Sequence, residues 1–201
     1  MAYDFDIFLS YRRASPENPS PVQDWVKNHF FPKLQQWLPQ ALGRPATVFI
    51  DFDRIETGTN WPLALQKGIK HSRCLLSVWS PDYFWSKWCV AEWESMRQRE
   101  QAVGRRSLHD PRGLVFPVIF SDGVSFPPTA DQTMGRKFHG LNYPEPVFAQ
   151  TPKYVEFVQA VQDLTNDLVP LIDDAPAWCA DWPVIDFPEV YQRPATALKR
   201  L

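Results

Sequence analysis

The amino-acid sequence predicts an α/β fold in which a doubly wound parallel sheet carries helices on both faces. Short apolar segments of strand length alternate along the chain with longer segments whose apolar residues recur at helical spacing. Strands separated by helices pair in parallel, and right-handed crossovers place those helices on both faces of the sheet. The chain has 201 residues, 44% of them hydrophobic, which is enough for one such domain and some additional sequence.

Four apolar segments are expected to form strands of this sheet. They cover residues 5–10, 47–51, 73–79 and 114–120. Ser80 and Pro81 end the third segment, and Pro117 interrupts the fourth. Because proline has no N–H to donate, the fourth strand is predicted to have a bulge or to lie at an edge there. A further short strand is expected over FHGLNY, residues 138–143.

Four segments are expected to be helical, over residues 20–38, 61–70, 86–103 and 153–169. In the first, Ser20 can cap the helix and Pro21 suits its first position. Pro32 must kink or interrupt the same helix, because its ring replaces an N–H and crowds the preceding turn. Gly68 weakens the end of the second helix.

After residue 169 the helical pattern is expected to end. Prolines follow at positions 170, 176, 183, 188 and 194, with no sustained period between them. We therefore divide the chain into a domain over residues 1–169 and a Pro-rich C-terminal arm or linker over residues 170–201. Trp178 and Trp182 favour an arm that packs on the domain, since a free linker seldom carries tryptophan.

Charge and cysteine content limit the possible functions. The net charge of −2 indicates no general attraction to nucleic acid or to an anionic membrane. Five arginines between residues 97 and 112 are interpreted as a solvated helix end and loop. The three cysteines are unevenly spaced, which favours a reducing cytoplasm over a disulfide framework. No signal peptide, membrane span or paired metal-ligand spacing is expected.

Ligands of doubly wound sheets bind beyond the carboxyl ends of the strands. The candidate site is therefore expected where residues 10–13, residues 51–58 and the segment after Ser80 converge. Arg12 and Arg13 suit a pyrophosphate, because a guanidinium presents a fork of donors. Nearby, Glu92 lies among tryptophans, and a buried carboxylate there would be unfavourable without a partner.

Residues 88 and 92 are one helical turn apart and share a face, whereas Cys89, Trp93 and Met96 point to another side. Taken alone, Glu92 could equally be a surface residue of an amphipathic helix and Trp88 a core residue. Arg12 and Arg13 could be an exposed loop pair, and Asp53 could simply form a turn. The strand ends lack the acids of a phosphoacceptor receiver, and no Gly-rich phosphate loop is present.

Several segments, taken in order, resemble the Toll/interleukin-1 receptor (TIR) domain family. FDIFLSYRR is similar to its opening strand, VFIDFDRIETG to its second strand and BB loop, and SRCLLSVWSPDY to its third strand. WCVAE, residues 88–92, is similar to the Trp-x-x-x-Glu motif of the TIR domains that cleave NAD, and FHGLNY to the last strand. The resemblance covers about residues 4–168. It implies a flavodoxin-like fold with five parallel strands.

The resemblance to the NAD-cleaving bacterial type implies an NAD+ glycohydrolase or cyclase, with Glu92 as the catalytic carboxylate. The residues expected to bind NAD+ are Tyr11, Arg12, Arg13, Asp53 and Trp88. NAD+ is the substrate, and neither a cofactor nor a metal is implied. Compared with the family, the segment over residues 83–87 is short and the Pro-rich stretch before FHGLNY is long. Because these segments shape the rim of the pocket, the choice between ADP-ribose and a cyclic isomer stays open.

The resemblance also implies action in an assembly. In similar TIR domains the BB loop, here with Phe52, Arg54, Ile55 and Gly58, reaches a neighbouring subunit. Apolar anchors beside mixed charges suit such a self-complementary contact. The partners implied are NAD+, other TIR domains in a homo-oligomer or filament, and a fused or separate sensor module, in a cytoplasmic defence effector. The alternative is a non-catalytic TIR scaffold that signals by homotypic contact. Trp88 and Glu92 together favour the enzyme.

Overall fold

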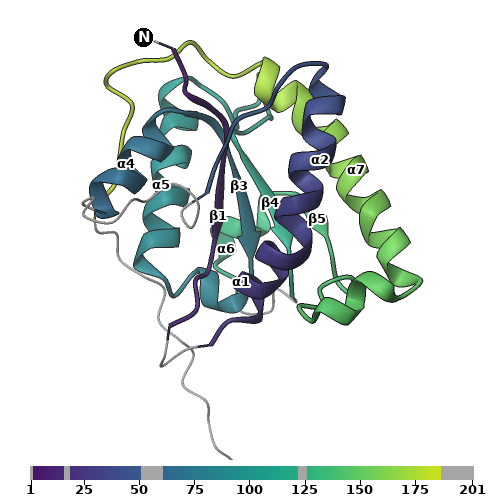
Figure 1. Ribbon diagram of the computed structural model, residues 1–201. Coiled ribbons are helices and arrows are strands. Elements are labelled where there is room, and N and C mark those ends of the chain that lie inside the picture. Colours follow the sequence, from purple (N-terminus) through teal and green to yellow (C-terminus); the bar gives the residue numbers. More distant parts are fainter. Residues whose placement is uncertain (1, 16–18, 51–60, 122–125, 187–201) are drawn as a thin grey trace, which may run out of the picture.

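The computed structural model describes residues 2–15, 19–50, 61–121 and 126–186 (Figure 1). A five-stranded sheet runs through the described part in the order β2-β1-β3-β4-β5, and every pair of neighbours is parallel. The strands are β1 (Phe5–Tyr11), β2 (Val48–Phe49), β3 (Ser72–Trp79), β4 (Val115–Ile119) and β5 (Arg136–Lys137). The predicted doubly wound, flavodoxin-like fold class is confirmed.

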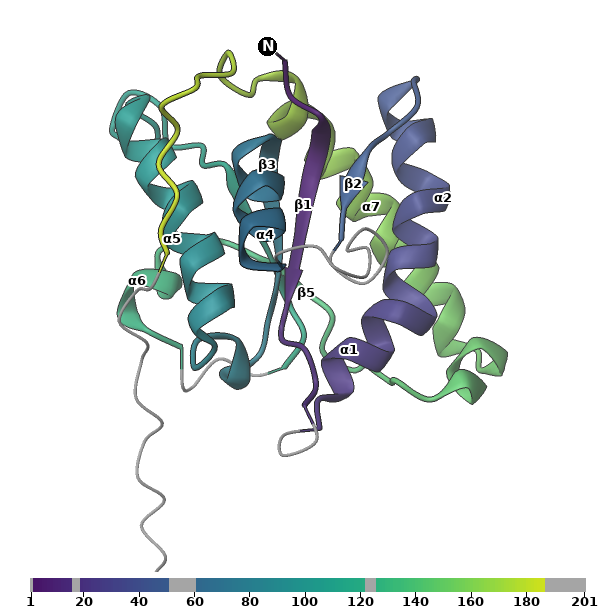
Figure 2. The same ribbon diagram turned by 60° about the vertical axis from the view of Figure 1, so that its left-hand side comes forward.

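Helices cover both faces of this sheet (Figures 1 and 2). One face carries α1 (Pro21–Trp25), the π-helical η1 (Val26–Phe30), α2 (Phe31–Leu42) and α7 (Lys153–Asp173). The other carries α4 (Trp61–Lys70), α5 (Lys87–Ala102) and the short α6 (Pro128–Asp131). Short 3-10 helices lie at η2 (Pro81–Tyr83) and η3 (Pro146–Gln150). None of the described helices has the length and apolar character needed to cross a membrane.

Strand β1 shows how the two cores form. Ile7 and Leu9 pack under α1, α2 and α7, whereas Phe8 packs under α4 and α5. This division follows from the two-residue period of a strand, which sends successive side chains to opposite faces. Both faces are buried, so the strand is apolar almost throughout.

Asp6 is the charged residue of β1, and several donors hold its carboxylate. Arg44 donates to both carboxylate oxygens, at 3.0 and 2.8 Å, and the backbone N–H of Thr47 donates at 2.9 Å. Burial alone would raise the pKa of Asp6, but the hydrogen bonds from Arg44 and Thr47 outweigh it and hold the pKa below its ordinary value. The contact ties β1 to the start of β2.

Two prolines have the effects expected of them. The helix widens into the π turn η1 directly before Pro32, as predicted for an interruption, because the ring crowds the preceding turn. The register of β4 with β3 is continuous through Pro117, so there is no bulge. Strand β5 pairs only with Val118 and Ile119, which leaves β4 without a β5 partner at Pro117.

Two boundaries differ from the sequence prediction. The last strand is Arg136–Lys137, and FHGLNY, which follows it, forms a turn in which Gly140 has a φ of 78°. Helix α7 continues to Asp173, four residues beyond the predicted domain boundary, with Pro170 inside its last turn. Residues 174–186 then cross the top of the molecule and run beside α4 and α5, as the yellow segment of Figures 1 and 2 shows.

Candidate active site

The carboxyl end of β1 and the first turns of α5 enclose a cavity of about 230 Å³. Its lining residues are Tyr11, Arg12, Arg13, Ala14, Ser15, Ser86, Trp88, Cys89 and Glu92. This is the edge of the sheet where a ligand is expected in a doubly wound fold. The structure therefore brings together Tyr11, Arg12, Arg13, Trp88 and Glu92, which lie in two segments far apart in the sequence.

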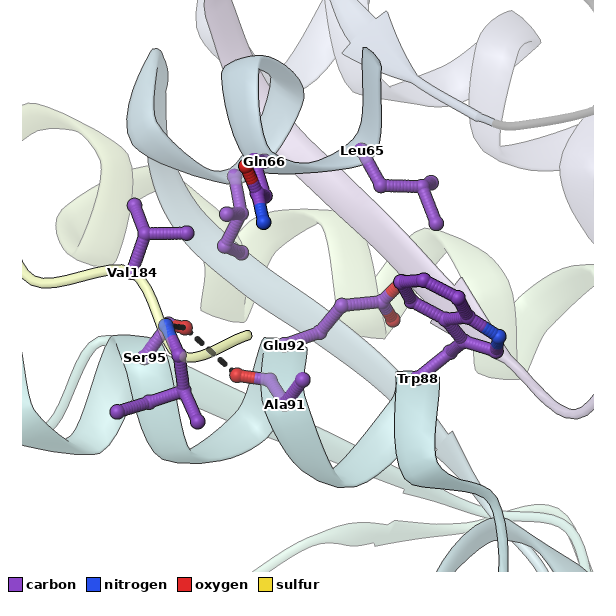
Figure 3. Close-up of a pocket in the computed structure, with 9 residues that line it drawn as sticks. Leu65, Gln66, Trp88, Ala91, Glu92, Ser95 and Val184 are labelled. Atoms are coloured by element: carbon purple, nitrogen blue, oxygen red, sulfur yellow. Dashed lines mark hydrogen bonds between the residues drawn. The ribbon is translucent and has the colours of Figure 1, made fainter. Parts of the chain in front are cut away.

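The start of α5 fixes the direction of Glu92. Ser86 caps the helix, and its side chain accepts a hydrogen bond from the Cys89 N–H at 3.4 Å. Cys89, Trp93 and Met96 are buried against the sheet, as predicted for the apolar stripe of this helix. Trp88 and Glu92 occupy another face and are half-buried. Figure 3 shows the Glu92 carboxylate directed toward the Trp88 indole.

Two buried hydroxyl groups, those of Ser10 and Tyr83, position the Glu92 carboxylate. Ser10, in β1, donates from Oγ to Oε2 of Glu92 at 2.5 Å, and lies 2.8 Å from the hydroxyl of Tyr83. Since Ser10 has one hydroxyl proton and donates it to Glu92, Tyr83 must donate to Ser10. Ser10 is 2% exposed and Tyr83 is fully buried. The result is a chain of hydrogen bonds from Tyr83 through Ser10 to Glu92.

The surroundings of Tyr83 keep its phenol protonated. Burial raises the pKa of Tyr83 well above its ordinary value, and the neighbouring Cys89 and Glu92 raise it further. The phenol therefore stays a donor over the whole physiological pH range. A donor that cannot ionise is suited to orienting a carboxylate without competing for its charge.

A second, much smaller space lies on the opposite side of Glu92, between α4, α5 and residues 184–185 (Figure 3). Its volume is about 20 Å³. The residues around it are Leu65, Gln66, Ile69, Trp88, Ala91, Glu92, Ser95, Val184 and Ile185. Glu92 and Trp88 thus border both the larger cavity on the β1 side and the smaller recess on the α4 side.

The predicted site residues differ in how the structure places them. Arg12, Trp88 and Glu92 are half-buried at the cavity, and Arg13 is exposed at its rim. Tyr11 also lines the cavity, but it is only 4% exposed and belongs to the core beneath α1 and α2. The predicted substrate-binding residue Asp53 and the predicted assembly residues Phe52, Arg54, Ile55 and Gly58 lie outside the described residues.

The sequence prediction placed Ser10 at the candidate site without a role and gave Tyr83 no role. The signal for Ser10 is its alternation with Phe8, which places a hydroxyl on the α5 face of β1 at the end that binds ligands. Tyr83 gives no such signal, because only the turn η2 brings it behind Ser10. Among the described residues, no three His, Cys, Asp or Glu side chains are grouped so that they could hold a metal ion.

Comparisons with known proteins bear on the family. A family model described as a TIR domain matches residues 7–144. The TIR domain of the Toll-related receptor TRR-2 from Hydra magnipapillata is 17% identical, with 77% of this chain and 98% of that chain covered and a TM-score of 0.44. The TIR domains of the activated Roq1 resistosome, which recognises the pathogen effector XopQ, are 18% identical, with 85% and 96% covered and a TM-score of 0.42.

No curated protein sequence matches the chain. The family model nevertheless spans well over half of the 201 residues, and the five-stranded parallel sheet is the one expected for that family. The chain belongs to the TIR domain family.

Proposed function

We propose that the protein cleaves the bond between nicotinamide and ribose in NAD+, with Glu92 as the catalytic carboxylate. The products are nicotinamide and either ADP-ribose or a cyclic ADP-ribose isomer. The observation that carries the proposal is the hydrogen bond between Ser10 and Glu92, because it fixes a carboxylate at the wall of a cavity that also contains two arginines.

One carboxylate is enough for this reaction. Glycosidases use two carboxyl groups, one of which protonates the leaving oxygen. In NAD+ the nicotinamide is already cationic and departs as a neutral molecule without protonation. Glu92 then has to bind the ribose hydroxyls and to stabilise the positive charge that develops on the sugar ring. A preorganised group of this kind contributes about 3–4 kcal/mol to transition-state stabilisation.

The cavity accommodates the reacting half of the substrate. Its volume of about 230 Å³ is below the range of roughly 300–1,000 Å³ usual for sites that enclose a drug-sized ligand. We therefore expect nicotinamide and its ribose to enter beside Trp88 and Glu92. The pyrophosphate would lie outward, where Arg12 and Arg13 offer forked donors. Trp88 supplies a flat surface for the base and excludes water from one side of the sugar.

The biological setting is proposed by analogy with the TIR family, to which this chain belongs. As the resemblance described above implies, TIR domains include enzymes that cleave NAD+ and modules that assemble with one another. We propose that this protein acts in the cytoplasm as a defence effector that becomes active when copies assemble. Ordering a mobile segment costs about 1–2 kcal/mol per residue, and a neighbouring subunit in an assembly can offset such a cost.

A product assay tests the proposal. The purified full chain is incubated with NAD+ at several protein concentrations, with and without a macromolecular crowder, and the products are separated by chromatography. We expect nicotinamide to be released in equal amount to ADP-ribose or its cyclic isomer. A folded chain that assembles but releases no nicotinamide at any concentration would instead indicate the non-catalytic scaffold.

A further inference from the structure

Residues 174–186, here called the arm, connect α7 on one face of the sheet with α4 and α5 on the other (Figures 1 and 2). The arm contains no helix or strand, yet specific contacts hold it at both ends. At the start of the arm, Asp174 pairs with Arg112. At its other end, Asp186 accepts a hydrogen bond from Gln66 of α4.

The two tryptophans of the arm anchor its middle. The Trp178 ring lies 5.3 Å from the His71 ring, and the Trp182 ring lies 5.1 Å from the Arg99 guanidinium. Arg99 is fully buried, contrary to the solvated helix end predicted for its segment. It donates to the carbonyls of Ile69 and Ser72, where α4 ends and β3 begins. Trp182 is only 9% exposed, so it closes the outer side of this polar cluster.

Arg99 stays charged despite its burial. Desolvation, offset only in part by the nearby Tyr3, lowers its pKa to about 10. At neutral pH the guanidinium is therefore still a cation. It satisfies carbonyl groups that the end of a helix leaves without a partner. Trp182 thus contacts the residue that joins α5 to the end of α4.

Beyond Trp182 the arm reaches the recess beside Glu92. The N–H of Ile185 donates to Ser95 Oγ at 2.8 Å, and the same hydroxyl donates to the Ala91 carbonyl at 2.6 Å. Val184 packs against the core beneath α4 and α5. Figure 3 shows Val184 beside Ser95, whereas the Glu92 side chain extends away from it toward Trp88. Val184 and Ile185 line the recess of about 20 Å³ that Glu92 also borders.

We infer that the arm is a positioning element of the Glu92 site, not a linker. It holds α4 against α5, and its Val184 and Ile185 form an apolar wall of the recess that Glu92 also lines. This apolar lining limits the room for water beside Glu92 and keeps its side chain directed toward Trp88, so the charge acts on a substrate in the cavity on the β1 side. The functional domain accordingly extends to Asp186. This inference rests on the proposed reaction for its effect on rate, but not for the attachment of the arm.

Variants of Val184 in the full-length chain test the wall. Val184→Asn keeps the size of the side chain and makes it polar, whereas Val184→Ile keeps the wall apolar. Asp181→Ala serves as a control, because Asp181 is an exposed arm residue whose side chain takes part neither in the Trp182 contact nor in the Val184 wall. We expect kcat for NAD+ to fall about tenfold in Val184→Asn, with KM within about twofold. Val184→Ile and Asp181→Ala should match the original chain. Equal kcat values for Val184→Asn and Val184→Ile would show that an apolar side chain at position 184 does not affect the Glu92 site.

Amide hydrogen exchange tests the attachment without any enzymatic readout. Trp182→Ala should increase exchange in α4 and in residues 93–99 of α5, while Asp181→Ala should not. If exchange in α4 and α5 is unchanged in the Trp182→Ala variant, the arm does not hold α4 against α5. If no form of the protein cleaves NAD+, the proposed reaction fails, and the exchange comparison still decides whether the arm holds α4 on α5.

Discussion

The hydroxyl of Ser10 lies 2.5 Å from the Oε2 atom of Glu92, and the two residues are separated by 82 positions in the sequence. Ser10 belongs to the central strand β1, and Glu92 belongs to α5, so the bond joins the sheet to the helix that carries the candidate catalytic group. Tyr83 supports it from behind at 2.8 Å. The carboxylate is therefore oriented by rigid elements, as an efficient catalytic site requires.

Replacing Ser10 tests the importance of this orientation. Ser10→Ala should lower kcat about 10- to 100-fold, because a hydrogen bond to a charged group contributes about 1.5–3 kcal/mol. Steady-state kinetics with NAD+ and a thermal melt measure the two effects separately. Ser80→Ala is a matched control, since Ser80 is a buried serine whose hydroxyl has no partner among the described residues. A kcat within threefold of the original chain in folded Ser10→Ala would contradict the positioning role.

Glu92→Gln removes the charge of the candidate catalytic group and retains its shape. NAD+ cleavage should fall by at least 100-fold with an unchanged fold, because glutamine cannot stabilise a developing cation. The measurement is nicotinamide release, with circular dichroism as the check on folding. Glu94→Gln is the matched control on the same helix, where Glu94 pairs with Arg97 at 3.2 Å. Activity of folded Glu92→Gln within about tenfold of the original would disprove the assignment.

Trp88 is predicted to control the fate of the ribosyl cation. It lines the cavity one helical turn from Glu92 and can both stack on a base and exclude water. Trp88→Ala should shift any cyclic product toward linear ADP-ribose, or abolish activity, whereas Trp88→Phe should retain part of the product ratio. Chromatography of the products gives the ratio directly. An identical rate and ratio in Trp88→Ala would leave this residue with a packing role alone.

The assembly prediction concerns Phe52, Arg54, Ile55 and Gly58, which lie outside the described residues. If a neighbouring subunit completes the site, specific activity should increase with protein concentration. Ile55→Asp should abolish that increase, because it places a charge in an apolar contact, and it should leave the melting temperature unchanged. Activity per molecule is measured over a hundredfold dilution, with sedimentation to follow assembly. Constant specific activity over that range would exclude control by assembly.

Asp6 provides a prediction about pH and stability. Its pKa is lowered in the folded chain, so the stabilisation is fully present above about pH 4 and is lost as the pH falls through the lowered value. Asp6→Asn should therefore reduce the free energy of unfolding by about 1.5–3 kcal/mol at pH 7, with a smaller difference at pH 3. Urea unfolding at both pH values measures this. The exposed Asp24 provides the control Asp24→Asn. A difference that grows on acidification would show that the sign is wrong.

The sequence by itself determined the fold class and the ligand-binding edge. Strand and helix periods, together with the turn at Ser80 and Pro81, are local properties, and the rules for parallel crossovers convert them into a doubly wound sheet. The same rules placed Arg12 and Glu92 at one edge, and the structure brings both to one cavity. The last strand was predicted over residues 138–143 but lies at Arg136–Lys137, because a strand of two residues carries almost no periodic signal in the sequence.

Only the tertiary structure decided what surrounds Glu92. Ser10 and Tyr83 reach it through contacts between distant segments. Strand alternation places Ser10 on the α5 face, but no local pattern pairs it with Glu92 or brings Tyr83 behind it. Arg99 was expected in solvent because arginine is usually exposed, but the carbonyls of the α4–β3 junction and Trp182 together compensate its burial. Trp178 and Trp182 indicated an arm that packs on the domain, but where it packs could not be predicted, because its contacts come from α4 and α5 and not from a backbone period of its own.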